Sequence, residues 1–451
     1  MNSTSEIRWD PIESILAGAS EEKLLERGDE LYRWLSDLFP VCRSLTGNGV
    51  RQTISYFQRL LPGLQIHEVP SGTAAFDWTV PAEWNIRAAW IKDSQGKTVV
   101  DFAHNNLHVV GYSIPVQATL SLDELQPHLH TLPEQPDAIP YITSYYKPYW
   151  GFCLTERQRA TLGPGEYTVC IDSTLEPGSL TYADLVIPGK SAREVFLSTY
   201  VCHPSLANNE LSGPVIMAAI GQYLLAHAPH LEYTYRLVFI PETIGSIVYL
   251  SRHLEHLQKQ VVAGFNLTCL GDDKSYSVLH SRYGNTYADR IASHIVRTLC
   301  PDAKHYSYLT RGSDERQYCA PGIDLPFVSL MRSKYAEYDA YHTSLDNLDF
   351  VSPAGLQGGF RFVRQCLNLI EHNFRYRTTV LGEPQLGKRG LYPSLSTKHS
   401  YRQVSLLKNV IAYSDGTQDI LDLAERFECH ANDIIRIYHI LLDHHLVTRV
   451  D

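Results

Sequence analysis

The sequence lacks the cysteine pattern of a disulfide-bonded or zinc-finger protein. Its nine cysteines are an odd number, and no two of them form a Cys-x-x-Cys pair. Scattered cysteines of this kind are typical of free thiols in a reducing compartment. We therefore expect the fold to be stabilised by hydrophobic cores rather than by covalent cross-links.

The sequence also lacks long apolar runs and an excess of basic residues. No stretch of about 18 apolar residues is present, and residues 1–14 do not show the basic-then-apolar pattern of a signal peptide. The net charge of −10 argues against a general affinity for nucleic acids or anionic membranes. We expect a cytoplasmic protein with neither a membrane nor a nucleic-acid partner.

The 451 residues are more than one hydrophobic core usually organises, so several domains are expected. In residues 1–63 and 164–380, apolar strands alternate with helical segments, which predicts an α/β domain. Residues 64–163 contain short alternating segments and turn signals, which predict an inserted β-rich domain. Residues 390–451 follow a Gly/Pro-rich linker and contain three short helical stretches, as in a winged helix.

Apolar residues at helical spacing predict the helices of the α/β domain. Their expected ranges are Glu21–Phe39, Val50–Leu61, Pro214–Ala226, Ser246–Gln260, Tyr287–Leu299 and Pro353–Phe374. Alternation of such helices with apolar strands predicts a mostly parallel sheet with helices on both faces.

The candidate catalytic and metal-binding residues lie close to the ends of predicted strands and helices. His203 and Glu242 each come after an apolar strand, and His342 precedes the final helix of the domain. A sheet would bring all three to one edge, and a catalytic zinc site commonly uses two histidines and one carboxylate. The carboxylate ligand could be Glu210 or Glu242. The other one is then the expected general base.

Five segments carry a resemblance to a known family. They are Cys202–Gly213, Ile240–Ser246, Phe265–Asp273, Gly312–Tyr318 and Tyr341–Asp349. In this order they resemble the zinc aminopeptidases that include bacterial leucyl aminopeptidases and glutaminyl cyclase. More closely, the chain resembles a branch of aminopeptidase-like proteins of polysaccharide biosynthesis with an inserted β module and a winged-helix tail. The resemblance implies a metal-dependent hydrolase of peptide or amide bonds.

The chain departs from the family at several expected metal-binding positions. The metal-bridging aspartate falls on Asn208, the acidic pair is reduced to Glu242 with a preceding proline, and another aspartate is replaced by Thr268. Asparagine and threonine are poor zinc ligands, so we expect one Zn²⁺ per chain rather than two. Asp314 is expected to orient a ligand histidine.

In the preferred arrangement, His203, Glu210 and His342 hold this zinc and Glu242 is the catalytic base. The rival arrangement exchanges Glu210 and Glu242. Cys202 is not expected to act as a nucleophile, because adjacent residues of an extended segment point in opposite directions.

The predicted function is zinc-dependent hydrolysis of an amide bond in a small peptide-like or sugar-linked metabolite. The alternatives are a non-catalytic scaffold with an aminopeptidase-like fold and a ligand-sensing regulator. Residues 390–451 contain six basic and eight acidic side chains. A DNA-binding domain normally presents a basic face, so this tail is expected to support self-association into a homo-oligomer instead.

Overall fold

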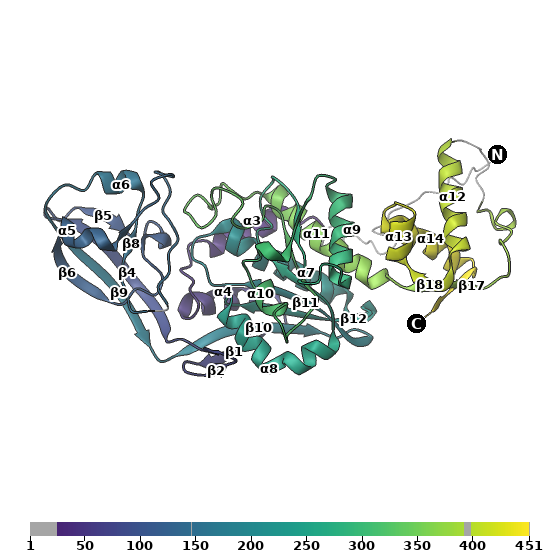
Figure 1. Cartoon of the computed structure of the whole chain (residues 1–451), viewed down its shortest axis with the longest axis horizontal. Coiled ribbons are helices and arrows are strands. Elements are labelled where there is room, and N and C mark those ends of the chain that lie inside the picture. Colours follow the sequence, from purple (N-terminus) through teal and green to yellow (C-terminus); the bar gives the residue numbers. More distant parts are fainter. Residues whose placement is uncertain (1–24, 146, 392–397, 451) are drawn as a thin grey trace. The chain divides into compact units, whose positions relative to one another are not determined.

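The computed structural model describes residues 25–145, 147–391 and 398–450. The chain divides into two compact units, one formed by residues 27–363 and the other including residues 364–450 (Figure 1). The first residues of the helix expected from Glu21 lie outside the described part of the chain.

An eight-stranded mixed sheet forms the centre of the first unit. In spatial order it contains β1 (Gln65–Pro70), β10 (Ser179–Ile187), β12 (Tyr233–Ile240), β11 (Ser191–Tyr200), β13 (Val261–Leu267), β16 (Phe327–Met331), β14 (Ser277–Leu279) and β15 (Lys304–Tyr306). The central strands β12, β11, β13 and β16 are parallel, whereas β1, β10 and β14 pair antiparallel with their neighbours. The expected α/β class is confirmed.

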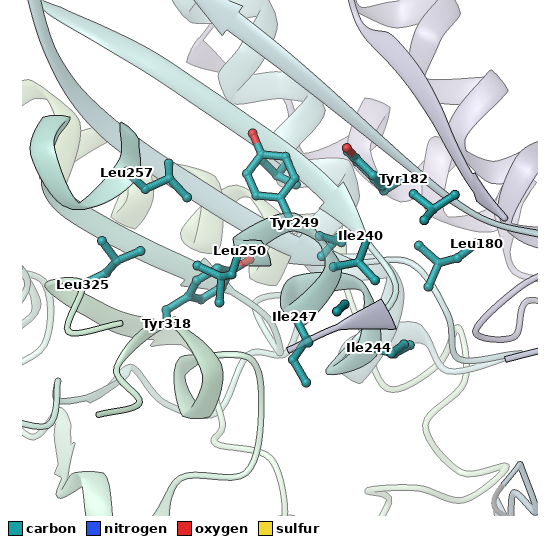
Figure 2. Packing of buried hydrophobic residues seen from close by; sticks show 14 of the residues in the cluster. Leu180, Tyr182, Ile240, Ile244, Ile247, Tyr249, Leu250, Leu257, Tyr318 and Leu325 are labelled. Atoms are coloured by element: carbon teal, nitrogen blue, oxygen red, sulfur yellow. The ribbon is translucent and has the colours of Figure 1, made fainter. Parts of the chain in front are cut away.

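Helices pack on both faces of this sheet. They are α3 (Gly28–Leu38), α4 (Asn48–Leu60), α7 (Ser212–His227), α8 (Ile244–Gln260), α9 (Tyr287–Leu299), α10 (Glu315–Tyr318) and α11 (Pro353–His372). On one face, Phe57 of α4 stacks on Phe239 of β12, with ring centroids 5.0 Å apart. On the other face, Tyr249 of α8 packs edge-to-face on Tyr182 of β10, and Ile247 of α8 belongs to the same buried cluster (Figure 2). Side chains alternate between faces along each strand, so each strand contributes to both cores.

Helix α9 begins and ends at the residues expected from the sequence. Thr286 caps its N-terminus, because its side chain accepts a hydrogen bond from the backbone N–H of Asp289. The Asp289 side chain in turn accepts a hydrogen bond from the backbone N–H of Thr286. This capping box satisfies two backbone donors that a helix leaves unpaired at its start.

A four-stranded antiparallel sheet forms the core of the inserted module. Its spatial order is β5 (Thr98–Asp101), β4 (Glu83–Asp93), β9 (Glu166–Glu176) and β6 (Val116–Ser121). The shorter elements around it are β2 (Ala74–Ala75), β3 (Trp78–Thr79), β7 (Leu129–His130), β8 (Phe152–Cys153), α5 (Leu122–Leu125) and α6 (Glu156–Ala160).

The boundaries of the module differ from the range of 64–163 expected from the sequence. Residues Gln65–Pro70 form β1 at the edge of the large sheet, paired with β10, and β9 continues to Glu176. Short alternating segments look alike in the two sheets. Only the pairing of β1 with a distant strand assigns it to the large sheet.

The second unit is a winged helix. Its helices are α12 (Lys398–Ala412), α13 (Ile420–Arg426) and α14 (Ala431–Asp443), and its antiparallel sheet contains β18 (Asp415–Asp419), β17 (Arg375–Thr378) and β19 (Val447–Val450). Tyr376 of β17 stacks on Tyr438 of α14 with ring centroids 4.0 Å apart. The unit therefore uses a strand that precedes the expected boundary at residue 390.

Among the described residues, one helical segment, Ala207–His230, is long and apolar enough to cross a membrane by length and composition, but 67% of its 18-residue apolar window is buried inside the protein. A core helix between a sheet and its covering layer has the same composition, because it is apolar on all sides.

Candidate metal centre

The candidate site lies where neighbouring strands end. β11 and β12 run parallel side by side, so the segments that follow them, carrying His203 and Glu242, leave the sheet at the same edge. His342 comes from the loop between β16 and α11, and its φ of 55° is in the left-handed region that non-glycine residues rarely adopt. The structure brings all three side chains together.

His203 is the centre of these contacts. Its Nδ1 lies 2.8 Å from Oε2 of Glu210, and its Nε2 lies 3.6 Å from Oε2 of Glu242. The ring centroids of His203 and His342 are 5.4 Å apart. All four residues predicted from the sequence therefore belong to one cluster, with Glu210 and Glu242 on opposite sides of the His203 ring.

Glu210 is held between two buried partners. It lies in a π-helical turn, η3 (Ala207–Leu211), directly before α7. Such turns within helices occur frequently at functional sites. Its Oε1 is 3.6 Å from Nε of Arg43, and both side chains are fully buried. Arg43 also donates from Nε to the carbonyl oxygen of His203 at 2.9 Å and from Nη1 to that of Leu38 at 2.8 Å. Arg43 was not identified from the sequence, because no motif surrounds it.

The surroundings set different protonation states for the two histidines. Burial lowers the pKa of His342 to about 3, so its imidazole is neutral and can offer a lone pair to a metal. Burial also acts to lower the pKa of His203, but Cys202, Tyr141 and the hydrogen bond to Glu210 raise it well above its ordinary value. At neutral pH the metal-free site therefore contains a neutral imidazole at His342 and a protonated one at His203, whose Nε2 would have to release its proton to bind a metal ion.

Two asparagines near the site have different roles. Both polar atoms of the Asn208 side-chain amide bind the loop after β13. Its Nδ2 donates to Asp272 at 3.2 Å, and its Oδ1 accepts from the Gly271 N–H at 2.8 Å. Asn209 donates from Nδ2 to the Tyr200 hydroxyl at 2.8 Å, and its buried Oδ1 has no partner among the described residues. The open amide oxygen thus belongs to Asn209 and not to Asn208, the position that aligns with the family's metal-bridging aspartate.

Asp314 positions the segment of Glu242 rather than a histidine, contrary to the expectation. Its Oδ1 accepts hydrogen bonds from the backbone N–H of Thr243 at 2.7 Å and from the hydroxyl of Ser246 at 2.8 Å. Burial, with a smaller contribution from the charge of Glu242, raises the pKa of Asp314 to about 7. Burial also raises the pKa of Glu242.

The donors present fit one zinc ion. Nε2 of His203, the ring of His342 and the carboxylate of Glu242 are two imidazoles and one carboxylate, a common set in catalytic zinc sites. Among the described residues, the group of three such side chains whose ligand atoms all lie within 4.8 Å of one another consists of Cys202, His203 and Glu210. In that group Nδ1 of His203 is already hydrogen-bonded to Glu210. The neutral side chains of Asn209 and Thr268 leave a second metal without carboxylate ligands.

Comparison with known proteins identifies the family of the chain. Residues 32–373 match the family described as "Domain of unknown function (DUF4910)", and residues 374–449 match the winged helix-turn-helix family. A Clostridium acetobutylicum protein described as a polysaccharide biosynthesis protein with an aminopeptidase-like domain is 44% identical over 402 residues, which cover 88% of this chain and 91% of the relative.

Two solved structures share the fold. A crystal structure described as a peptidase candidate from C. acetobutylicum is 41% identical, covers 95% of this chain and 98% of its own, and has a TM-score of 0.88. A zinc aminopeptidase from Bacillus subtilis is 13% identical, covers 77% of this chain and 95% of its own, and has a TM-score of 0.55. The chain belongs to the DUF4910 family, in which an aminopeptidase-like fold is followed here by a winged helix-turn-helix.

Proposed function

We propose that the chain hydrolyses an amide bond with one zinc ion held by His203 Nε2, His342 and Glu242. The observation that carries this proposal is the convergence of two imidazoles and a carboxylate at one edge of the parallel strands. Zinc in such a site supplies Lewis-acid polarisation of a substrate carbonyl group.

Of the two arrangements that the sequence leaves open, the geometry supports the one with Glu242 as a ligand. Glu210 is hydrogen-bonded to Nδ1 of His203, and its other oxygen faces Arg43. Nδ1 and Nε2 point in different directions from the ring, so Glu210, which contacts Nδ1, is poorly placed to share a metal with Nε2. A carboxylate at Nδ1 fixes the tautomer and the orientation of a ligand histidine. We assign Glu210 as a positioning residue.

Asp314 supports proton exchange in this site. Amide hydrolysis requires a proton for the leaving amine, and an acid with a pKa near the working pH is best suited to hold it. The pKa of Asp314 is about 7, raised by burial and by Glu242. We assign the exchangeable proton to its Oδ2, which is buried without a partner among the described residues.

Aromatic side chains beside the metal donors support a small substrate with planar or ring-shaped groups. Tyr341 stacks on His342 with ring centroids 3.9 Å apart, and Tyr141 lies within 5.2 Å of both site histidines, measured between ring centroids. Aromatic walls bind both sugar rings and peptide groups through their apolar faces. The description of the C. acetobutylicum relative favours a sugar-linked amide over a free peptide.

The test is metal analysis of the purified protein, followed by a screen of N-acylated sugars and aminoacylated compounds. We expect about one zinc per chain in the wild type and none in His342→Ala, because a ligand is lost. His230→Ala is the matched control, since His230 is exposed and lies outside the site. The proposal is wrong if the wild type binds no metal at saturating zinc or if it hydrolyses no amide in the screen.

A second candidate function is that of a regulator or scaffold, which the winged helix-turn-helix favours because such units often place a helix in the DNA major groove. The acidic side chains of α14 favour contact with a protein over contact with DNA. Arg436 is 3.5 Å from Asp433, and Asp443 adds a further negative charge to the same helix. We propose that this unit mediates self-association. A shift of labelled duplex DNA by the full chain at physiological salt would favour the regulator.

A further inference from the structure

One segment of the inserted module reaches the candidate site. This segment, residues 139–143, is called the strap below. The backbone N–H of Tyr141 donates to the carbonyl oxygen of His342 at 2.9 Å, and the N–H of Ser344 donates to the carbonyl oxygen of Ile139 at 2.9 Å. The strap therefore pairs with the loop that carries His342, and it holds this residue in its unusual left-handed conformation.

The ring of Tyr141 lies against both site histidines. Its centroid is 5.2 Å from that of His203 and 5.1 Å from that of His342, with edge-to-face geometry in each case. The ring that carries the Tyr141 hydroxyl thus lies beside both proposed histidine ligands.

Further contacts fix the module on the opposite side of the site. Asn106 of the module donates from Nδ2 to the Ser205 hydroxyl at 2.9 Å, in the loop that follows His203. Leu206 of the same loop is buried in a cluster with four module residues, Leu107, Val110, Ile139 and Cys153. Because the module is anchored to the loops of both histidines, the position of Tyr141 is set by packing rather than by a mobile tether.

We propose that the inserted module completes the active site through Tyr141, whose hydroxyl donates a hydrogen bond to the carbonyl oxygen of the scissile amide. This inference rests on the proposed amide hydrolysis. The carbonyl oxygen gains negative charge as the amide carbon is attacked, and a fixed donor stabilises that charge strongly in a site shielded from water. Tyr141 keeps its proton throughout, and no covalent bond to it forms.

The test compares the wild type with Tyr141→Phe, which keeps the ring but removes the hydroxyl. Tyr167→Phe is the matched control, because the Tyr167 hydroxyl lies in the same module and donates to the carbonyl oxygen of Gly163. The measurements are zinc content, the affinity of the zinc-loaded protein for inorganic phosphate by calorimetry, and kcat on an amide identified by the screen. Phosphate serves as a tetrahedral oxyanion.

We expect Tyr141→Phe to keep its zinc, to bind phosphate about 10- to 100-fold more weakly and to lower kcat by about 10²-fold with little change in KM. Tyr167→Phe should match the wild type in all three measurements. Unchanged phosphate affinity and kcat in Tyr141→Phe would overturn the inference alone. The wild type could instead bind zinc, bind phosphate more tightly than Tyr141→Phe does, and hydrolyse no amide. This result would overturn the proposed reaction and leave Tyr141 as an anion-binding residue. A wild type without zinc would overturn both.

Discussion

Oε2 of Glu210 lies 2.8 Å from Nδ1 of His203, and this contact determines which nitrogen of the ring remains available for a metal ion. A carboxylate at Nδ1 holds the proton on that nitrogen, so Nε2 is the nitrogen that would release its proton to bind a metal ion. Nε2 is the nitrogen nearer Glu242, at 3.6 Å. The ligand set proposed above follows from this orientation.

The first prediction concerns the two glutamates. Glu210→Ala should weaken zinc binding by about 10- to 100-fold, because the imidazole loses its orienting partner, yet one zinc should still bind at saturation. Glu242→Gln should lose the metal, because a ligand is removed. Competition with a chelating dye measures both affinities. If Glu242→Gln retained zinc and Glu210→Ala lost it, the result would contradict this assignment and support the arrangement with Glu210 as the ligand.

The second prediction concerns the buried cation. Arg43→Met should lower the free energy of unfolding by about 3–5 kcal/mol, because it leaves the carboxylate of Glu210 buried without its cationic neighbour. The double variant Arg43→Met/Glu210→Gln should recover part of this loss, because the uncompensated charge is then gone. Urea unfolding of the zinc-free proteins measures the coupling. Strictly additive effects would show that the two residues do not interact.

The third prediction concerns stability in acid. Nη1 of Arg51 on α4 donates to Oε1 of Glu83 on β4 at 2.7 Å, and this bond lowers the pKa of Glu83 from 4.5 to about 2. The resulting stabilisation is present above pH 4.5 and is lost as the pH falls from 4.5 towards 2. Glu83→Gln should therefore be less stable than the wild type at pH 6, with a difference that shrinks in this window. A difference that is constant from pH 6 to 2.5 would contradict the assignment.

The fourth prediction concerns the winged helix. A chain that ends at Asn373 should keep the zinc affinity of the full chain but form a smaller assembly, because we place self-association in residues 374–450. Light scattering after size-exclusion chromatography measures the mass of each form. Equal assembly states of the two chains would place the contact elsewhere, and specific duplex binding by the full chain would favour a regulator.

Much of the fold is predictable from local signals. The apolar periodicity and the capping pair of Thr286 and Asp289 place α9 at its observed bounds. Long-range pairing is not visible in this way. Residues Gln65–Pro70 were assigned to the inserted module, because a short strand carries no local mark of the sheet that it joins.

The same limit applies to the site. His203, Glu242 and His342 could be chosen because they follow strands or precede a helix, and parallel strands end at one edge. The side of the imidazole ring that faces Glu210 could not be predicted, because it depends on the π-helical turn η3 and on a buried arginine far away in the sequence. Tyr141 was missed because the strap has no motif of its own and reaches the site only through the docking of the module.

The strap also has a consequence for biosynthesis of the chain. Arg43 and Tyr141 are translated before His203 and Glu242, and His342 is translated after all of them. Contacts between such distant segments form late in folding, because the entropy of closing long loops must be overcome first. A nascent chain that has not yet reached residue 342 lacks both the last imidazole and the backbone partner of the strap. The proposed metal site therefore cannot form before residue 342 has been synthesised.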